Sequence, residues 1–166
     1  KNYELAFKYY LKSAELEESW ACNKVGEFYR LGTHCQKDLK KAFTYYKTAL
    51  DVPKNLQNNY AKYNLAKYFY LNGCYEMGIE KNIPSALSLL KDASNHNLLE
   101  ATIELLNYYT KLYFQKKEKN ILEKINQLLF EIESHPLYNK KQKEQIEITI
   151  NTLKKEEKIN RNLFKD

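Results

Sequence analysis

Small and apolar residues recur along the chain with the 3.6-residue period of an α-helix. In the segment 21–32 they form one face, which consists of Ala21, Val25, Gly26, Tyr29 and finally Gly32. A second amphipathic run begins at Asp38, a favourable N-cap residue, and its inward stripe consists of Ala42, Tyr45, Tyr46, Ala49 and Leu50. The two runs together predict a helical hairpin whose helices approach closely at small residues.

The same pattern returns on both sides of this hairpin. Downstream, the first-helix face is repeated by Ala61, Leu65, Ala66 and Phe69 before Asn72 and Gly73, and the second-helix face by Ala86, Leu89, Leu90 and Ala93 behind Asn82. A third first-helix face consists of Ala101, Leu105, Leu106 and Tyr109. Upstream, the second helix alone is matched, by Asn2, Ala6, Tyr9, Tyr10, Ser13 and Ala14. Recurrence at this spacing predicts an array of helix pairs, with the longer loops at 51–59 and 74–81 absorbing the inserted residues.

The last third of the chain has a different pattern. Residues 120–133 predict a helix capped by Asn120, with an apolar face of Ile121, Ile125, Leu128, Leu129 and Ile132. Ser134, His135 and Pro136 end it. A final helix is predicted from about Tyr138 to Leu163, with Ile146, Ile150 and Leu153 facing inward. We expect these helices to cap the array; a docking surface for a further domain and a homo-oligomer contact through the last helix are the alternatives.

The hairpin at 21–50 resembles the Sel-one-like repeat (SLR), a relative of the tetratricopeptide repeat. The matching positions of the pattern A-x-x-x-L-G-x-x-Y-x-x-G and D-x-x-K-A-x-x-Y-Y-x-x-A are Ala21, Gly26, Tyr29, Gly32, Asp38, Lys41, Ala42, Tyr45, Tyr46 and Ala49. The copy at 61–93 is degenerate, and the copy beginning at Ala101 keeps only its first helix. The resemblance covers about residues 2–113.

This resemblance implies an all-α fold, an α–α superhelix in which helix hairpins form a repeat solenoid. We therefore expect degenerate Sel-one-like repeats over 1–118 and C-terminal capping helices over 119–166, packed as a single domain. The family also implies an adaptor or scaffold for other proteins, with no catalytic residues to carry over. Because only half a repeat lies at 2–14, we expect the chain to be a segment of a longer protein.

The amino-acid composition agrees with a helical fold and narrows the classes of binding partner. The 166 residues include only 4 glycines and 3 prolines, too few turn residues for a β-sandwich or barrel. No apolar run approaches the roughly 20 residues of a membrane helix. The 27 basic and 21 acidic residues give a net charge of +6, but the excess is evenly spread lysine. Nucleic-acid sites favour clustered arginine, so lysine-mediated nucleic-acid binding is a disfavoured alternative.

Cysteine and histidine give no sign of a cofactor. Three cysteines without C-x-x-C spacing favour reduced thiols and a cytoplasmic location. Some secreted relatives of the resembled family link each helix pair by a disulfide; Cys22 and Cys35 fit such a link, but the next copy has only Cys74, which disfavours it. His34, His96 and His135 lie singly in predicted loops, so we expect no metal site. Because catalytic motifs are also absent, we expect no enzyme activity and no cofactor.

The resemblance implies where a protein or peptide partner would bind. In tetratricopeptide-type repeats a concave groove is lined by first-helix residues three before the consensus glycine and one and four after it. The corresponding residues here are Asn23, Glu27, Arg30, Tyr63, Lys67, Tyr70, Ile103, Asn107 and Thr110. Mixed aromatic and polar residues are typical of peptide-binding surfaces, although simple solvation of these side chains is the alternative. The carboxylate clamp of some tetratricopeptide proteins is not reproduced.

The sequence thus predicts a non-catalytic protein–protein interaction module. A peptide-sensing or regulatory segment of a larger bacterial protein is the alternative function. The sequence preceding Lys1 would discriminate the two, because a DNA-binding or kinase motif there favours regulation and further repeats favour a scaffold.

Overall fold

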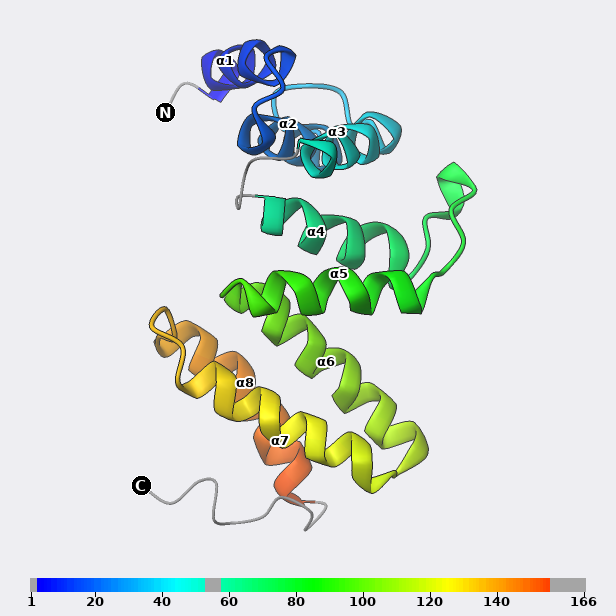
Figure 1. Cartoon of the computed structure of the whole chain (residues 1–166), viewed down its shortest axis with the longest axis vertical. Coiled ribbons are helices and arrows are strands. Elements are labelled where there is room, and N and C mark those ends of the chain that lie inside the picture. Colours follow the sequence, from blue (N-terminus) through cyan, green and yellow to red (C-terminus); the bar gives the residue numbers. More distant parts are fainter. Residues whose placement is uncertain (1–2, 53–57, 156–166) are drawn as a thin grey trace. The chain divides into compact units, whose positions relative to one another are not determined.

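The structure, a computed structural model, describes residues 3–52 and 58–155, and the regular elements in those ranges are helices (Figure 1). One isolated β-bridge, between Cys74 and Ile79, closes the loop between two of them. The chain divides into two compact units, Lys1–His96 and Asn97–Asp166. In the described residues no helix combines the length and apolar character needed to cross a membrane.

The first unit is a succession of helices that each pack on the next (Figure 1). They are α1 (Tyr3–Glu15), α2 (Ser19–Leu31), α3 (Leu39–Asp51), α4 (Asn59–Leu65) and α5 (Ile83–Asn95). The helix α4 continues directly into a π-helical segment, Ala66–Tyr70. The predicted hairpins are therefore α2–α3 and α4–α5. Part of the predicted loop at 51–59 falls on residues 53–57, outside the described residues.

Three ends of these helices are fixed by residues that the sequence indicated. Gly32 ends α2 in the left-handed conformation (φ 70°), and its N–H donates to the Phe28 carbonyl. The Asp38 carboxylate accepts a hydrogen bond from the Lys41 N–H at 2.8 Å, and the Asn82 side chain accepts one from the Ser85 N–H at 3.0 Å. Both predicted N-caps are thus confirmed.

The predicted inward faces form the core of the first unit. Residues with no exposed surface include Ala21, Val25, Ala42, Tyr46, Ala49, Ala61, Leu65, Ala66, Ala86, Leu90 and Ala93. At the crossing of α2 and α3 the Tyr46 ring lies directly on Gly26, where an added Cβ would be 2.6 Å from Tyr46 Cε1. Only glycine fits between the backbone of α2 and this ring, which confirms the predicted close approach.

On α1 the prediction needs a correction. Phe7 and Ala14 are the buried residues, and the Phe7 ring contacts Phe28 with centroids 5.1 Å apart, whereas the predicted inward residue Tyr9 is 61% exposed. The equivalent residue of α3, Tyr45, stacks on Tyr29 of the preceding helix. No helix precedes α1 among the described residues, so Tyr9 has no such surface to cover it. Asn2 lies outside the described residues.

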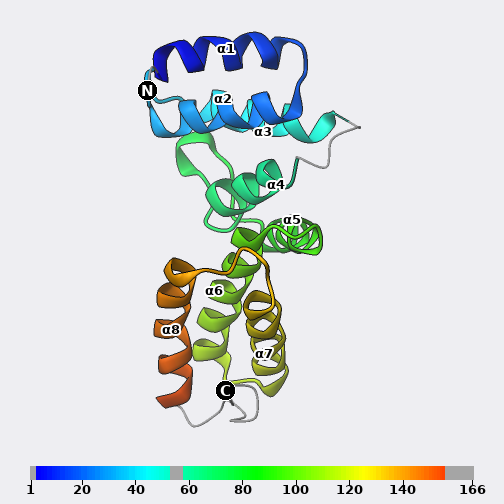
Figure 2. The same cartoon turned by 90° about the vertical axis from the view of Figure 1, so that its left-hand side faces the viewer.

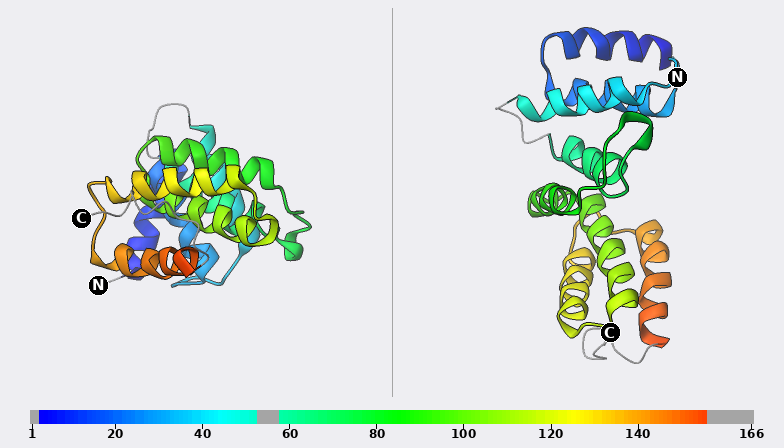
Figure 3. Two further views of the ribbon diagram at one scale, coloured as in Figure 1. Left: turned by 90° about the horizontal axis from the view of Figure 1, so that it is seen from below. Right: turned by 90° about the vertical axis from the view of Figure 1, so that its right-hand side faces the viewer.

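In the second unit, the described residues up to Lys155 form three helices that lie side by side (Figures 2 and 3). They are α6 (Leu99–Lys116), α7 (Lys119–Glu133) and α8 (Lys140–Lys155). The predicted inward faces are confirmed, since the following residues are buried: Leu105, Leu106, Tyr109, Ile121, Ile125, Leu128, Leu129, Ile132, Ile146, Ile150 and Leu153.

Two boundaries in this unit differ from the prediction. The helix α7 begins at Lys119 with Glu118 as the N-cap residue, so the predicted cap Asn120 lies inside the first turn. The helix α8 begins at Lys140, not near Tyr138, and the predicted stretch from 156 to Leu163 lies outside the described residues. Adjacent polar residues make a helix start ambiguous by a residue or two. The division of the chain into repeats over 1–118 and a cap over 119–166 stays a prediction.

Candidate functional site

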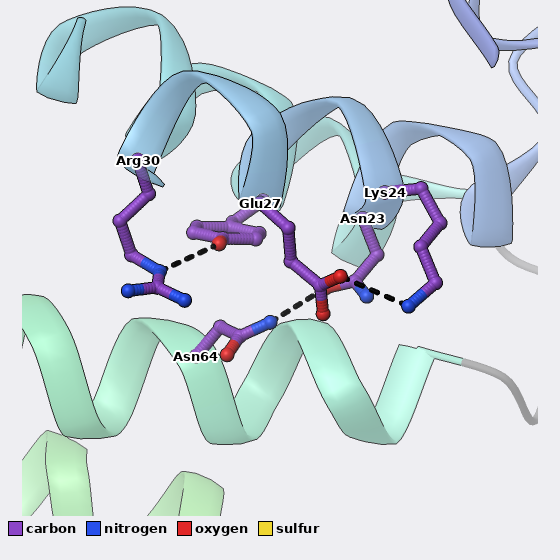
Figure 4. A network of polar contacts seen from close by, with 6 residues as sticks. Asn23, Lys24, Glu27, Arg30 and Asn64 are labelled. Atoms are coloured by element: carbon purple, nitrogen blue, oxygen red, sulfur yellow. Dashed lines mark hydrogen bonds and ion pairs between the residues drawn. The ribbon is translucent and has the colours of Figure 1, made fainter. Parts of the chain in front are cut away.

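The helices α2 and α4 face each other through polar side chains (Figure 4). Asn23 and Asn64 lie between them, 2% and 4% exposed, and Asn64 Nδ2 donates a hydrogen bond of 2.9 Å to Asn23 Oδ1. A buried amide needs such a partner, so the pair fixes how the first helices of the two hairpins lie against each other. The predicted binding residue Asn23 therefore serves this internal contact and presents almost no surface.

Arg30 lies at the other end of the same interface. Its Nε donates to Tyr46 Oη at 3.3 Å, and its guanidinium carbon lies 3.9 Å from the centroid of the Tyr68 ring. Burial raises the pKa of Tyr46 well above its ordinary value, although the hydrogen bond from Arg30 opposes this. The phenol is therefore neutral at ordinary pH, and two neutral groups hold the half-buried Arg30 cation.

Tyr63 and Lys67, both predicted, meet on α4. Lys67 Nζ donates to Tyr63 Oη at 2.8 Å and lies 5.2 Å from the centroid of that ring and 5.8 Å from that of Tyr68. Glu27, on α2, forms an ion pair of 2.9 Å with Lys24 (Figure 4). All three predicted side chains are partly exposed, and each is held by a neighbour.

The π-helical segment explains why Tyr68 stands beside Arg30. Gly73 lies one residue further from Ala61 than Gly32 lies from Ala21. The extra residue is accommodated by a wider turn, in which the Leu71 N–H donates to the Ala66 carbonyl, five residues back, at 2.8 Å.

The wider turn shifts the equivalence of the two hairpins by one residue beyond Ala66. In the first hairpin the Asp38 N–H donates to the Tyr29 carbonyl, and in the second the Asn82 N–H donates to the Tyr70 carbonyl, both at 2.9 Å. Tyr70 is therefore the counterpart of Tyr29, not of Arg30, and its ring packs edge-on against Phe43. The prediction counted positions from Ala61 without allowing for the extra residue. It therefore included Tyr70 and omitted Tyr68.

The remaining predicted residues lie on α6, in the second unit. Ile103 is 7% exposed, and Asn107 and Thr110 are partly exposed. Thr110 Oγ1 is buried and has no hydrogen-bond partner within the described ranges. Any part that α6 plays in binding stays a prediction.

The cysteines and histidines take internal or surface positions of their own. Cys22 and Cys74 are buried and Cys35 is partly buried, and all three are free thiols. Burial raises the pKa of the Cys22 and Cys35 thiols, which disfavours the reactive thiolate. The His34 ring stacks on Tyr3, with centroids 5.4 Å apart. Within residues 3–52 and 58–155, no three His, Cys, Asp or Glu side chains are grouped so as to hold a metal ion.

Comparisons with known proteins agree with this architecture. The family model of the Sel1 repeat matches residues 1–17, 21–51 and 59–98, more than half of the chain. Among solved structures, a Sel1 repeat protein from Oxalobacter formigenes is similar, with a TM-score of 0.58 and 21% sequence identity over 78% of this chain and 47% of that one. This chain thus matches about half the length of that protein. The likeness shows the fold, an all-α helical repeat of the α–α superhelix class. Comparison with curated proteins gave no match.

Proposed function

Since the chain belongs to the Sel1 repeat family, we propose that it is a non-catalytic interaction module that binds a protein or peptide on one face of its first unit. Sel1 repeats are generally protein–protein interaction modules. The face consists of Glu27, Arg30, Tyr63, Lys67 and Tyr68, and is called the α2/α4 face below. It joins the first helices of two successive hairpins.

One observation carries the proposal: aromatic and cationic side chains of the α2/α4 face are partly exposed and already held in place. Lys67 is hydrogen-bonded to Tyr63, and Arg30 is stacked on Tyr68. Tyrosine and arginine dominate the binding energy of many interfaces because they offer a large contact area together with hydrogen-bond donors. Side chains that are ordered before binding lose less conformational entropy when a partner arrives.

A matched pair of double variants tests the proposal. Tyr63→Ala with Lys67→Ala removes two partly exposed side chains of the α2/α4 face. Tyr75→Ala with Lys47→Ala removes the same two side-chain types from exposed positions elsewhere in the first unit. Each protein is used as bait in quantitative affinity capture with mass-spectrometric identification, and captured partners are then tested as purified proteins by calorimetry.

We expect partners of the wild type to bind the control double variant unchanged and to lose at least about tenfold in affinity for Tyr63→Ala with Lys67→Ala, since two contact residues each contribute more than about 1 kcal/mol. Both variants should keep the helical circular dichroism of the wild type. Partners that bind both variants equally well would refute a role for the α2/α4 face.

Three finer predictions remain attached to this function. A homo-oligomer through α8 is a candidate because Ile148 on that helix is 71% exposed, and sedimentation of the wild type against Ile148→Lys would test it. The cytoplasmic location and the role as a regulatory segment of a larger protein both stay predictions from the sequence.

A further inference from the structure

Arg30 is a half-buried cation without a carboxylate partner in the part of the chain that the structure describes. Glu27, one helical turn before Arg30 on α2, is already matched with a lysine, since it pairs with Lys24 at 2.9 Å. The two groups that hold Arg30, the Tyr46 phenol and the Tyr68 ring, are both neutral, so its positive charge is not compensated locally.

The orientation of the guanidinium leaves its recognition edge unused. Nε is occupied by Tyr46 Oη and one flat face by the Tyr68 ring. Neither terminal amino group of Arg30 forms a hydrogen bond within the described residues, and Figure 4 shows the group projecting from α2 toward α4. A guanidinium edge with its donors in one plane matches the two oxygens of a carboxylate.

We infer that Arg30 is the anchor of the α2/α4 face, and that its ligand is the side-chain carboxylate of an Asp or Glu in a bound peptide. The inference rests on the proposed function and specifies its partner chemistry. Apolar side chains next to that acid would pack against the Tyr63 and Tyr68 rings. Lys67, which directly precedes Tyr68 in the chain, adds a second positive charge near the bound carboxylate.

The orientation of Arg30 is established before binding. A long charged side chain on an open surface gains little from an ion pair, because ordering its rotamers and stripping its water offset the attraction. Here the bond to the buried Tyr46 and the stack on Tyr68 have already ordered the side chain and removed part of its water. A carboxylate that meets it therefore gains most of the charge-assisted hydrogen-bond energy.

A displayed library of random twelve-residue peptides, inserted between fixed flanking sequences, is the probe. The fixed flanks exclude a free C-terminal carboxylate. Selection is carried out in parallel on the wild type, Arg30→Gln and the control Lys47→Gln, which removes the same charge from an exposed site on α3. Selected peptides are then made with amidated ends, and their affinities are measured by fluorescence anisotropy at two salt concentrations.

We expect acidic residues next to apolar ones to be enriched on the wild type and on Lys47→Gln, but not on Arg30→Gln. Affinity of the selected peptides should fall about 10- to 100-fold on Arg30→Gln, the range for a lost hydrogen bond between charged groups. Replacing the peptide acid by its amide should cost the wild type the same factor and Arg30→Gln almost nothing.

Arg30→Gln also removes the partner of the buried Tyr46 hydroxyl and could therefore disturb the fold. A second variant is the control for this effect. Tyr68→Leu keeps the Arg30 charge and its bond to Tyr46 but removes the ring that orients the guanidinium. We expect about a threefold loss of affinity for acidic peptides, in line with the modest strength of a cation–π contact. Thermal unfolding of each variant shows that the folded protein is being tested.

The outcomes separate the inference from the function on which it rests. Selected peptides that require Tyr63 and Lys67 but lack acidic residues, or bind Arg30→Gln as well as the wild type, overturn the inference and leave the proposed function standing. A library that yields no peptide dependent on Tyr63 and Lys67 overturns both. Tighter, Arg30-dependent binding of a single-stranded oligonucleotide would replace the carboxylate by a nucleic-acid phosphate and likewise overturn the inference.

Discussion

The two hairpins of the first unit, α2–α3 and α4–α5, solve the same packing problem with different pairs of residues. In the first, Gly26 makes room for the large ring of Tyr46, and in the second the equivalent positions hold Ala66 and Leu90. All the side chains concerned are fully buried. The first helix gains the methyl group of Ala66, and the second helix carries leucine, a smaller side chain than tyrosine and one without a ring. The hairpin crossing therefore constrains the volume of the pair more tightly than the identity of either residue.

The hairpins differ more on the surface than in the core. The wider turn in the second adds one residue to its first helix, yet Ala66, Phe69 and Leu71 remain buried around it. The added residue instead places Tyr68 against Arg30 of α2, and Lys67 lies beside the Tyr68 ring. A local change in helical winding can thus alter a candidate binding face without disturbing the buried contacts.

The largest effect should come from placing the alanine of the second hairpin in the first. In Gly26→Ala the new Cβ would lie 2.6 Å from a ring carbon of the buried Tyr46. Overpacking of this kind costs about 3 kcal/mol, of which the better helix propensity of alanine offsets about 1 kcal/mol. We expect the free energy of unfolding, measured with urea, to fall by about 2 kcal/mol.

The same substitution in a Tyr46→Leu background sharpens the comparison, because that background resembles the second hairpin. With the ring gone, only the helix-propensity gain remains, and Gly26→Ala should stabilise the protein by up to about 1 kcal/mol. An equal loss in both backgrounds would show that Tyr46 is not what requires glycine at position 26.

A smaller difference between the hairpins should appear at alkaline pH. Burial raises the pKa of Tyr46 far above the value of 10.0 that it has when exposed, whereas its counterpart Leu90 does not titrate. Below about pH 10 the phenol is neutral in both folded and unfolded states. Above it the unfolded chain loses the proton and the folded chain keeps it, so stability falls as pH rises. At about pH 11 the loss attributable to this residue should reach about 1.4 kcal/mol.

Tyr46→Phe isolates this contribution from those of Tyr45 and Tyr138, whose pKa values burial also raises. The free energies of unfolding of wild type and variant should be compared across the alkaline range. We expect the advantage of the wild type over Tyr46→Phe to shrink as pH rises above about 10. Parallel curves would mean that the Tyr46 phenol ionises as easily in the folded protein as in the unfolded chain.

The fold could be predicted almost entirely from the sequence because its determinants are local. The period of small and apolar residues located the inward faces, and Gly32, Asp38 and Asn82 fixed helix ends through their own side chains or backbone conformation. Tyr9 was an exception among the predicted inward residues. Its exposure depends on which helix lies beside α1, which the period within α1 cannot indicate.

The candidate site was predicted only in part, since its geometry depends on contacts between hairpins. Glu27 and Tyr63 keep their places in the repeat pattern, but Asn23 is buried against Asn64, a partner distant in the sequence. Tyr70 was misplaced because the extra residue before Gly73 shifts every later position by one. That extra residue was visible in the sequence, yet its accommodation as a wider turn, which selects Tyr68 as the neighbour of Arg30, is a property of packing against α2.

The smallest expected effect concerns a feature that the two hairpins share, which is a side-chain N-cap at the start of the second helix. Asp38→Ala and Asn82→Ala each remove one acceptor for a backbone N–H, and each should lower the free energy of unfolding by about 1 kcal/mol. Asp38→Asn should cost much less, because asparagine already performs this role in the second hairpin. Glu80→Ala, an exposed change in the loop before α5, is the control for the loss of a polar surface residue. If Asn82→Ala is no more destabilising than Glu80→Ala while Asp38→Ala is, the second hairpin begins its helix without help from the cap, and the equivalence of the two helix starts is only geometric.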